Sequence, residues 1–330
     1  MTTPTSPTKI ILDTDPGGDD IFALLWVLSL VRQGLAELVA ITTADGNVAA
    51  PQTFANASQL LGLTGFAGIE VGRGVPLKQA TAEDASHIHG TDGMGELSTT
   101  LPPPSCEYAI ARQADDLLID RLMAAPGEIT LVAIAPLTNL AAAEQKSPGI
   151  LRKAKEIVIM GGTFHYRGNV GPQAEFNIWF NPEAAQIVFE SRKDLVVMPL
   201  DVTSRLIFTR RMAQTISQMG PAGDLANFVV RLCEFMIGTA LRYRETNRVP
   251  GFLVHDAVTL GYLFYPETLT LRRARVRVET QGKWTRGQTL IDDRPLAKTD
   301  ANAWVALQVD EVGFFTHFIE DLKYLMKQIH

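Results

Sequence analysis

Four aspartates lie within eight consecutive positions of the segment 9–26, which reads KIILDTDPGGDDIFALLW. The apolar residues 10–12 directly before them are typical of a buried strand. Residues 16–18, Pro-Gly-Gly, predict a tight turn, and the apolar run after them has helical spacing. The segment therefore predicts a strand, a short loop and a helix, and its loop and helix start contain Asp13, Asp15, Asp19 and Asp20.

These carboxylates repel one another, so a bound cation must keep them ionised or one of them must take up a proton. Hard oxygen ligands of this kind suit Ca²⁺ or Mg²⁺ rather than zinc. A structural interpretation is also open, in which Asp19 and Asp20 stabilise the start of a helix through its dipole while Asp13 and Asp15 are solvated turn residues. Ligands of open α/β sheets bind beyond the carboxyl ends of the strands, which favours a ligand or metal site here.

Residues 13–20, DTDPGGDD, resemble the N-terminal signature of the nucleoside hydrolases of the inosine-uridine-preferring group. Members of this family are Ca²⁺-dependent N-ribohydrolases. The resemblance therefore implies an enzyme that cleaves the bond between a nucleobase and ribose. Further motifs in the family's order extend the resemblance from Lys9 to the C-terminal helix.

The composition argues against several other classes of protein. The chain has 330 residues and a net charge of −6, which argues against binding of nucleic acid through a basic surface. Its two cysteines, Cys106 and Cys233, cannot form a disulfide framework or a cysteine-rich zinc site, so we expect a cytoplasmic protein. No stretch approaches the ~20 apolar residues of a membrane span. We expect residues 1–8 to be a disordered tail without a signal peptide and residues 9–330 to form a single domain.

Apolar runs of strand length alternate with helical patterns along the chain. This alternation predicts an α/β fold with a Rossmann-like, open, mostly parallel sheet flanked by helices. Residues 275–280 and 285–291 flank a Gln-Gly-Lys turn and predict a C-terminal antiparallel hairpin. The other predicted strands are residues 10–12, 38–43, 69–72, 129–133, 156–160, 194–200 and 303–309, and the predicted helices are residues 53–63, 109–123, 314–326 and most of 206–246.

Two glycine-containing loops follow the early strands. Asn47, next to Gly46, is either a turn residue or a ligand for a hydroxyl group. His87 and His89 lie in the glycine-rich segment 87–95, where no cysteine or third histidine supports a transition metal, and a flexible surface loop is the alternative. The family carries a Gly-Asn pair and a His-Gly loop at its pocket, so the resemblance implies that Asn47 and His89 contact the substrate.

The segment 168–177, GNVGPQAEFN, is irregular and polar, and such segments are commonly functional. Its amide and carboxylate groups could hold sugar hydroxyls or satisfy the backbone of the loop itself. The pattern matches the ribose-binding loop of the nucleoside hydrolases. The resemblance implies that the 5′-hydroxyl is held by Asn169 and Glu175, and the 2′- and 3′-hydroxyls by Asp19, Asn177 and Asp256.

His255 and Asp256 directly precede a further apolar segment. A single buried histidine is more often a satisfied core residue than a catalyst, but the family has a His-Asp pair at this place. There the aspartate closes the Ca²⁺ site and the histidine faces the leaving base. Earlier in the chain, Thr138 or Asn139 could cap a helix, whereas the family's similar element implies that the carbonyl of Ile134 binds the metal.

The resemblance implies a complete set of roles. Hydrolysis of an N-ribosidic bond passes through an oxocarbenium-like cation, with Asp15 as the general base and His255 protonating or hydrogen-bonding the base that leaves. The Ca²⁺ ligands it implies are Asp15, Asp20, Ile134 and Asp256. The substrate-binding residues it implies are Asp19, Asn47, His89, Met160, Asn169, Glu175, Phe176, Asn177, Tyr243, His255 and Asp256. It also implies a ribonucleoside as the partner and a homo-oligomer, either a tetramer or a dimer.

Two other functions remain open. Residues 12–15 also resemble the Asp-x-Asp start of the haloacid-dehalogenase-like, Mg²⁺-dependent phosphatases, although that family has Thr or Val where this chain has Gly17. The other alternative is a non-catalytic nucleoside- or sugar-binding protein. The four aspartates together with His255 argue against it, because binding alone needs no such accumulation of charge.

Overall fold

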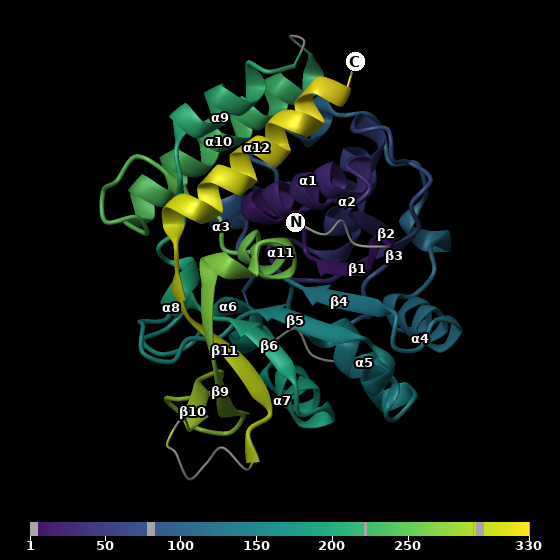
Figure 1. Cartoon of the computed structure of the whole chain (residues 1–330), viewed down its shortest axis with the longest axis vertical. Coiled ribbons are helices and arrows are strands. Elements are labelled where there is room, and N and C mark those ends of the chain that lie inside the picture. The colour runs from purple at the N-terminus through teal and green to yellow at the C-terminus, as the bar shows by residue number, and fades with distance from the viewer. Residues whose placement is uncertain (1–5, 78–82, 221–222, 293, 295–299, 330) are drawn as a thin grey trace.

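A nine-stranded sheet forms the centre of the computed structural model, which describes residues 6–77, 83–220, 223–292, 294 and 300–329. The strands of this sheet are β1 (Thr8–Thr14), β2 (Ala36–Thr43), β3 (Val71–Gly72), β4 (Ile129–Ala133), β5 (Glu156–Met160), β6 (Leu195–Met198), β9 (Leu269–Val278), β10 (Thr289–Asp292) and β11 (Ala303–Val309). Their spatial order is β10-β9-β11-β6-β5-β4-β1-β2-β3 (Figure 1). Strand β9 runs antiparallel to both of its neighbours, β10 and β11, and the other paired strands of this sheet are parallel. The predicted α/β class, the mostly parallel sheet and the C-terminal antiparallel hairpin are therefore confirmed.

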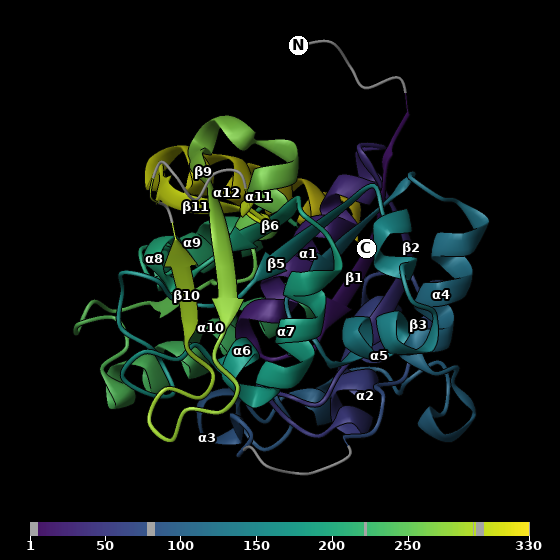
Figure 2. The same cartoon turned by 90° about the horizontal axis from the view of Figure 1, so that it is seen from below.

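Helices cover both faces of the sheet, which explains why its central strands are apolar almost throughout. Side chains alternate along β1, so that Ile10 and Leu12 pack in one hydrophobic cluster and Ile11 packs in the other. The first cluster lies under α1 (Gly18–Arg32), α2 (Ala50–Leu63), α9 (Arg210–Ser217), α10 (Asp224–Tyr243), α11 (Val258–Phe264) and α12 (Glu311–Gln328). The second cluster lies under α4 (Ala114–Ala124), α5 (Thr138–Lys146) and α7 (Pro182–Ser191), on the face nearer the viewer in Figure 2.

The strand order creates a switch point between β1 and β4. Strands β1, β2 and β3 proceed toward one edge of the sheet, while β4, β5 and β6 proceed toward the other. The register pairs Leu12 with Val132 and Asp13 with Ala133, so the two strands end at the same edge. Ligands of open α/β sheets bind in the crevice beside such a point. The aspartate segment after β1 and Ile134 after β4 therefore emerge side by side.

Helix α1 is the most deeply buried helix next to this point. Every residue from Gly18 to Leu30 is buried, because the helix lies between the sheet and helices α10 and α12. A helix that is apolar all round is typical of this position. Its N-terminus, with Asp19 and Asp20 in the first turn, is consequently held in a fixed place.

The N-terminal boundary of the fold differs from the prediction. Strand β1 begins at Thr8, inside the segment 1–8 that was predicted as a disordered tail, because the N–H of Thr8 donates to the carbonyl of Leu35 and extends the pairing with β2. The prediction for residues 1–5 lies outside the described residues.

The extent of helix also differs from the prediction in two segments. The helix predicted over 109–123 begins at Ala114, because Gln113 pairs with Arg73 in an extended conformation. The segment 87–95, predicted as a loop, begins within the short helix α3 (Ser86–His89). Within the described residues, no helix combines the length and the apolar character needed to cross a membrane.

Candidate active site

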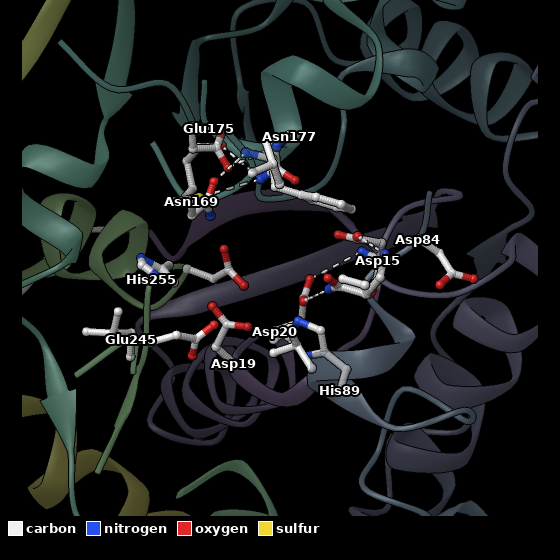
Figure 3. A pocket seen from close by; sticks show the side chains of 18 of the residues that line it. Asp15, Asp19, Asp20, Asp84, His89, Asn169, Glu175, Asn177, Glu245 and His255 are labelled. Carbon is white, nitrogen blue, oxygen red and sulfur yellow. Dashed lines mark hydrogen bonds between the residues drawn. The ribbon is translucent and has the colours of Figure 1, made fainter. Parts of the chain in front are cut away.

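A cavity of about 740 Å³ opens at the carboxyl ends of β1, β4 and β5 (Figure 3). The predicted site residues all line it, although they come from segments spread over the chain. Eight carboxylates contribute to the lining, and no lysine or arginine does so among the described residues. The predicted residues on its wall are Asp15, Asp19, Asp20, Asn47, His89, Ile134, Met160, Asn169, Glu175, Phe176, Asn177, Tyr243, His255 and Asp256.

The four aspartates of the first motif divide into two groups. Asp15, Asp19 and Asp20 line the cavity, and carboxylate atoms of Asp19, Asp20 and Asp256 lie within 4.8 Å of one another. Asp13 does not line the cavity, since its Oδ1 accepts hydrogen bonds from Thr42 (2.6 Å) and Asn139 (2.7 Å). Asp13 thus joins neighbouring elements behind the site.

Neither of the two residues suggested as a cap performs that role. The N-cap position of α5 is Leu137, without a side-chain cap bond. The amide of Asn139 instead donates to Asp13 and to the carbonyl of Thr43 (2.9 Å). Thr138 accepts a hydrogen bond from Asn181 (3.2 Å).

Asn47 connects two of the cavity aspartates. Its backbone N–H donates to Oδ2 of Asp15 (2.7 Å), and its side-chain amide donates to Oδ2 of Asp20 (2.9 Å). The other oxygen of Asp20 accepts from the hydroxyl of Thr14 (2.6 Å). These bonds fix the orientation of both carboxylates before any ligand arrives.

Glycines 17 and 46 make this close approach possible. A Cβ on Gly46 would overlap Oδ2 of Asp15, and a Cβ on Gly17 would lie 2.5 Å from the side-chain nitrogen of Asn47. The backbone at Gly17 has a φ of −110°, which other residues adopt freely. Space, rather than an unusual backbone conformation, therefore requires glycine at position 17.

Burial and mutual repulsion raise the pKa values of the cavity aspartates. Burial is the larger cause, and it raises the pKa of Asp19 to about 8 and that of Asp20 to about 6. Burial and repulsion from neighbouring aspartates raise the pKa values of Asp15 and Asp256 well above the usual range. A cation among these oxygens would reverse the shifts. The donor set, all oxygen and rich in carboxylates, fits a hard divalent cation.

The two histidines of the site are held in one orientation each. Nδ1 of His89 accepts a hydrogen bond from the N–H of Gly18 (2.8 Å) at the start of α1. Burial lowers the pKa of His89 to about 3, so its ring is neutral and Nε2 carries the proton. Nδ1 of His255 lies 2.7 Å from the hydroxyl of Thr203, and burial lowers the pKa of His255 to about 4.

The polar loop, residues 168–177, faces the acidic wall formed by Asp19 and Asp20 across the cavity (Figure 3). The carboxylate of Glu175 accepts backbone N–H bonds from Gly162, Asn177 and Ile178, so it caps the helix α6 (Phe176–Phe180). The amide of Asn177 donates to the carbonyls of Ile134 (2.9 Å) and Met160 (3.2 Å).

These contacts of the loop have two consequences. The carboxylate of Glu175 accepts hydrogen bonds from nearby backbone N–H groups, as one interpretation of the sequence expected. In addition, Asn177 joins the ends of β4 and β5 and holds the carbonyl of Ile134 at the cavity.

Sequence reasoning missed two residues of the site. Thr203, at the end of the helix α8 (Leu200–Thr203), contacts His255 because β7 (Ile207–Phe208) pairs with β8 (Phe252–Leu253). Glu245 enters the cavity from the segment after α10. No local pattern marks Glu245, and the segment 201–203, which resembles a family element, was assigned only a structural role. Tertiary contacts bring both residues to the site.

Tyr243, predicted to contact the substrate, is 45% exposed, and its ring contacts that of His87 (centroids 5.3 Å apart). This contact joins the end of α10 to α3 beside the cavity. Tyr243 therefore belongs to the mouth of the cavity rather than to its floor.

An open, mostly parallel sheet with an acidic cavity at its switch point defines the class of α/β proteins that bind small ligands at the carboxyl ends of their strands. Comparison with known proteins narrows this class. The family model for the inosine-uridine preferring nucleoside hydrolase matches residues 10–316. The chain belongs to this family, and it is a nucleoside N-ribohydrolase.

Individual relatives match along nearly the whole chain. The uridine nucleosidase 1 of Arabidopsis thaliana is 33% identical, over 97% of this chain and 93% of the relative. The inosine-uridine preferring nucleoside hydrolase of Leishmania major is 34% identical, over 96% of this chain and 98% of the relative. Among solved structures, the purine-preferring ribonucleoside hydrolase from Gardnerella vaginalis superposes with a TM-score of 0.88 at 28% identity, covering 97% of this chain and 99% of the other. The phosphatase and the non-catalytic binding protein are not favoured by these matches.

Proposed function

We propose that this chain hydrolyses ribonucleosides such as inosine and uridine to ribose and free base, using Ca²⁺ and the side chains of the cavity. The observation that carries the proposal is the cluster of Asp19, Asp20 and Asp256, whose carboxylate atoms lie within 4.8 Å of one another. The amides of the polar loop face this cluster. A neutral sugar rich in hydroxyl groups matches such a wall, whereas an anionic ligand meets repulsion from eight carboxylates.

The Ca²⁺ ligands in this proposal are the carboxylates of Asp15, Asp20 and Asp256 and the carbonyl of Ile134. The raised pKa values of the three aspartates in the absence of a cation support it. When bound, Ca²⁺ supplies a water molecule of lowered pKa. Asp15 is the proposed base that takes a proton from this water. Its Oδ2 accepts from the backbone N–H of Asn47, which holds the carboxylate in one orientation.

The ribose is proposed to lie between the acidic cluster and the polar loop. Asp19, Asn177 and Asp256 would hold the 2′- and 3′-hydroxyls, and Asn169 and Glu175 the 5′-hydroxyl. Asn47, Met160 and Phe176 are further proposed substrate contacts. His89 and Tyr243 are proposed to contact the substrate next to its nucleobase. The negative charge of this pocket also favours the positive charge that develops on the ribosyl ring.

His255 is proposed to assist departure of the base. The hydroxyl of Thr203 lies at Nδ1, so a neutral ring that accepts this hydrogen bond carries its proton on Nε2. Nε2–H can then donate to a ring nitrogen of the base as the bond to ribose breaks. As part of the same proposal, residues 9–330 form one domain, and the protein works as a homo-oligomer, a dimer or a tetramer.

The test is a substrate panel for the purified protein in Ca²⁺. Inosine and uridine should release ribose, and an aryl phosphate should release no phosphate. The 2′-deoxy analogues should be poorer by ~10⁴-fold or more in kcat/KM, because they leave buried polar groups of the sugar site unpaired. Absence of ribose from every ribonucleoside would overturn the proposed activity, whereas equal rates on inosine and deoxyinosine would overturn only the sugar site.

A further inference from the structure

The carboxylate of Glu245 points into the cavity toward Asp19 (Figure 3), and its charge contributes to the raised pKa of Asp19. Glu245 directly follows α10, whose C-cap residue Arg244 has a left-handed φ of 60°. The N–H of Glu245 donates to the carbonyl of Ala240 (3.0 Å) and closes the helix end. The side chain is half-buried, and none of the proposed roles uses it.

The segment that carries Glu245 is constrained. Besides Arg244, both Asn247 and Arg248 have positive φ angles (51° and 72°), a conformation that non-glycine residues adopt only when their surroundings enforce it. The hydroxyl of the buried Thr246 donates to the carbonyl of Val249 (2.7 Å) and fixes the turn. The turn therefore directs Glu245 into the cavity in a defined orientation.

Within the described residues, no hydrogen-bond donor or basic side chain reaches the carboxylate of Glu245. By contrast, Glu234 on the preceding helix α10 has a basic partner, Arg210, at 3.7 Å. Burial raises the pKa of Glu245 above its usual value. A half-buried carboxylate without a donor is unfavourable, and the lining of the cavity offers no lysine or arginine in the part of the chain that the structure describes. A ligand that fills this side of the cavity displaces water from the carboxylate of Glu245, so the ligand itself must supply a donor.

The position of Glu245 indicates which part of the ligand it meets. Figure 3 shows Asn169 and Glu175, the proposed partners of the 5′-hydroxyl, on the side of the cavity opposite to Glu245. The segment that begins at Glu245 leads through β8 to His255, the proposed contact of the leaving base. Glu245 therefore lies on the side of the base.

We propose that Glu245 accepts a hydrogen bond from the lactam or imide N–H of the nucleobase, and that it thereby selects hypoxanthine, guanine and uracil nucleosides. The inference depends on the proposed function and names a specificity-determining residue for it. An N–H donor satisfies a carboxylate, whereas a base that is methylated at this nitrogen brings no donor and leaves Glu245 unpaired.

The experiment compares the wild type with Glu245→Ala and Glu245→Gln, and with Glu37→Gln as a control at an exposed position of β2. The substrates are inosine, N1-methylinosine and p-nitrophenyl β-D-riboside, which has no base N–H. We expect Glu245→Ala to lower kcat/KM for inosine by about 10- to 100-fold, the range for a hydrogen bond to a charged group. The aryl riboside should change less than about 3-fold, which also shows that the variant is folded and binds ribose.

The remaining measurements complete the test. Glu245→Gln, which keeps an acceptor oxygen but loses the charge, should lie between the wild type and Glu245→Ala on inosine. The preference of the wild type for inosine over N1-methylinosine should shrink in Glu245→Ala. Equal losses on inosine and the aryl riboside, or an unchanged preference against N1-methylinosine, would overturn the inference while the hydrolase activity stands. A wild type that cleaves none of the three substrates would instead overturn the proposed function.

Discussion

Nδ1 of His255 and the hydroxyl of Thr203 are 2.7 Å apart, although the two residues are 52 positions apart in the chain. The pairing of β7 with β8 brings their segments together. A hydroxyl at Nδ1 fixes the orientation of the ring, and when the hydroxyl donates to Nδ1 the neutral ring carries its proton on Nε2. Thr203 is therefore a positioning residue for the group proposed to meet the leaving base.

Replacement of Thr203 tests this relationship. Thr203→Val keeps the shape but removes the hydroxyl, and we expect kcat/KM for inosine to fall by about 3- to 10-fold, as for loss of one neutral hydrogen bond. Thr203→Ser should restore most of the activity. Both variants should keep nearly full activity on p-nitrophenyl riboside, whose leaving group needs little help. A loss shared equally by the two substrates would indicate a general structural defect instead.

Substitutions of His255 and Asp256 should distinguish assistance to the leaving base from binding of the metal and the sugar. Departure of a natural base depends on proton donation, which contributes typically ~10²- to 10⁴-fold. We expect His255→Ala to lose this factor on at least one natural nucleoside and to retain most activity on the aryl riboside. Asp256→Ala should lose both activities, because it removes part of the metal and sugar site. If His255→Ala loses both substrates equally with its Ca²⁺ content intact, the role at the leaving base is wrong.

Removal of the metal should affect stability as well as activity. A ligand that binds only the folded state stabilises it, by about 2.7 kcal/mol at a concentration 100 times Kd. We therefore expect chelation to abolish ribose release and to lower the melting temperature, and added Ca²⁺ to restore both. Asp256→Asn should show a much smaller response of its melting temperature to Ca²⁺. Unchanged melting and activity after verified loss of metal would contradict the proposed cofactor.

The buried His89 should make stability depend on pH. Its folded-state pKa of about 3 lies below the ordinary value of 6.5, so between these values the unfolded chain binds a proton that the folded chain excludes. The contribution is complete above pH 6.5 and is lost as the pH falls toward 3, with a slope of up to about 1.4 kcal/mol per pH unit. His89→Gln, whose side-chain oxygen can still accept from Gly18, should lose this slope. Denaturant unfolding of both metal-free proteins between pH 4 and 7 provides the measurement, and parallel curves would refute the prediction.

The sequence predicted the sheet well where local pattern and tertiary environment agree. The run at residues 129–133 is apolar at every position but one, and it forms a strand because helices cover both faces of the sheet. The strand predicted over 194–200 ends at Met198, since Leu200 begins α8. The helix predicted from 109 starts later because Gln113 pairs with Arg73, a partner forty positions away that no local pattern reveals.

In the candidate site, too, features that depend on neighbouring residues were predictable, and features that depend on distant partners were not. The spacing of Asp15, Asp19 and Asp20 around a Pro-Gly-Gly turn was sufficient to predict a cation site, because repulsion among adjacent carboxylates acts over a few residues. The different environment of Asp13 was not predictable, since its partners Thr42 and Asn139 come from other elements.

The class of fold, the acidic loop after the first strand and the family follow from the sequence alone, because they depend on periodicity and on motifs of neighbouring residues. Which side chains meet depends on the three-dimensional fold. It brought Asp256 to Asp19 and Asp20, Thr203 to His255, and Glu245 to the side of the cavity that faces the proposed base. Such contacts arise from strand order and helix packing between segments that are far apart in the chain. A hydrogen bond or a charge interaction between such segments produces no local sequence pattern from which it could be predicted.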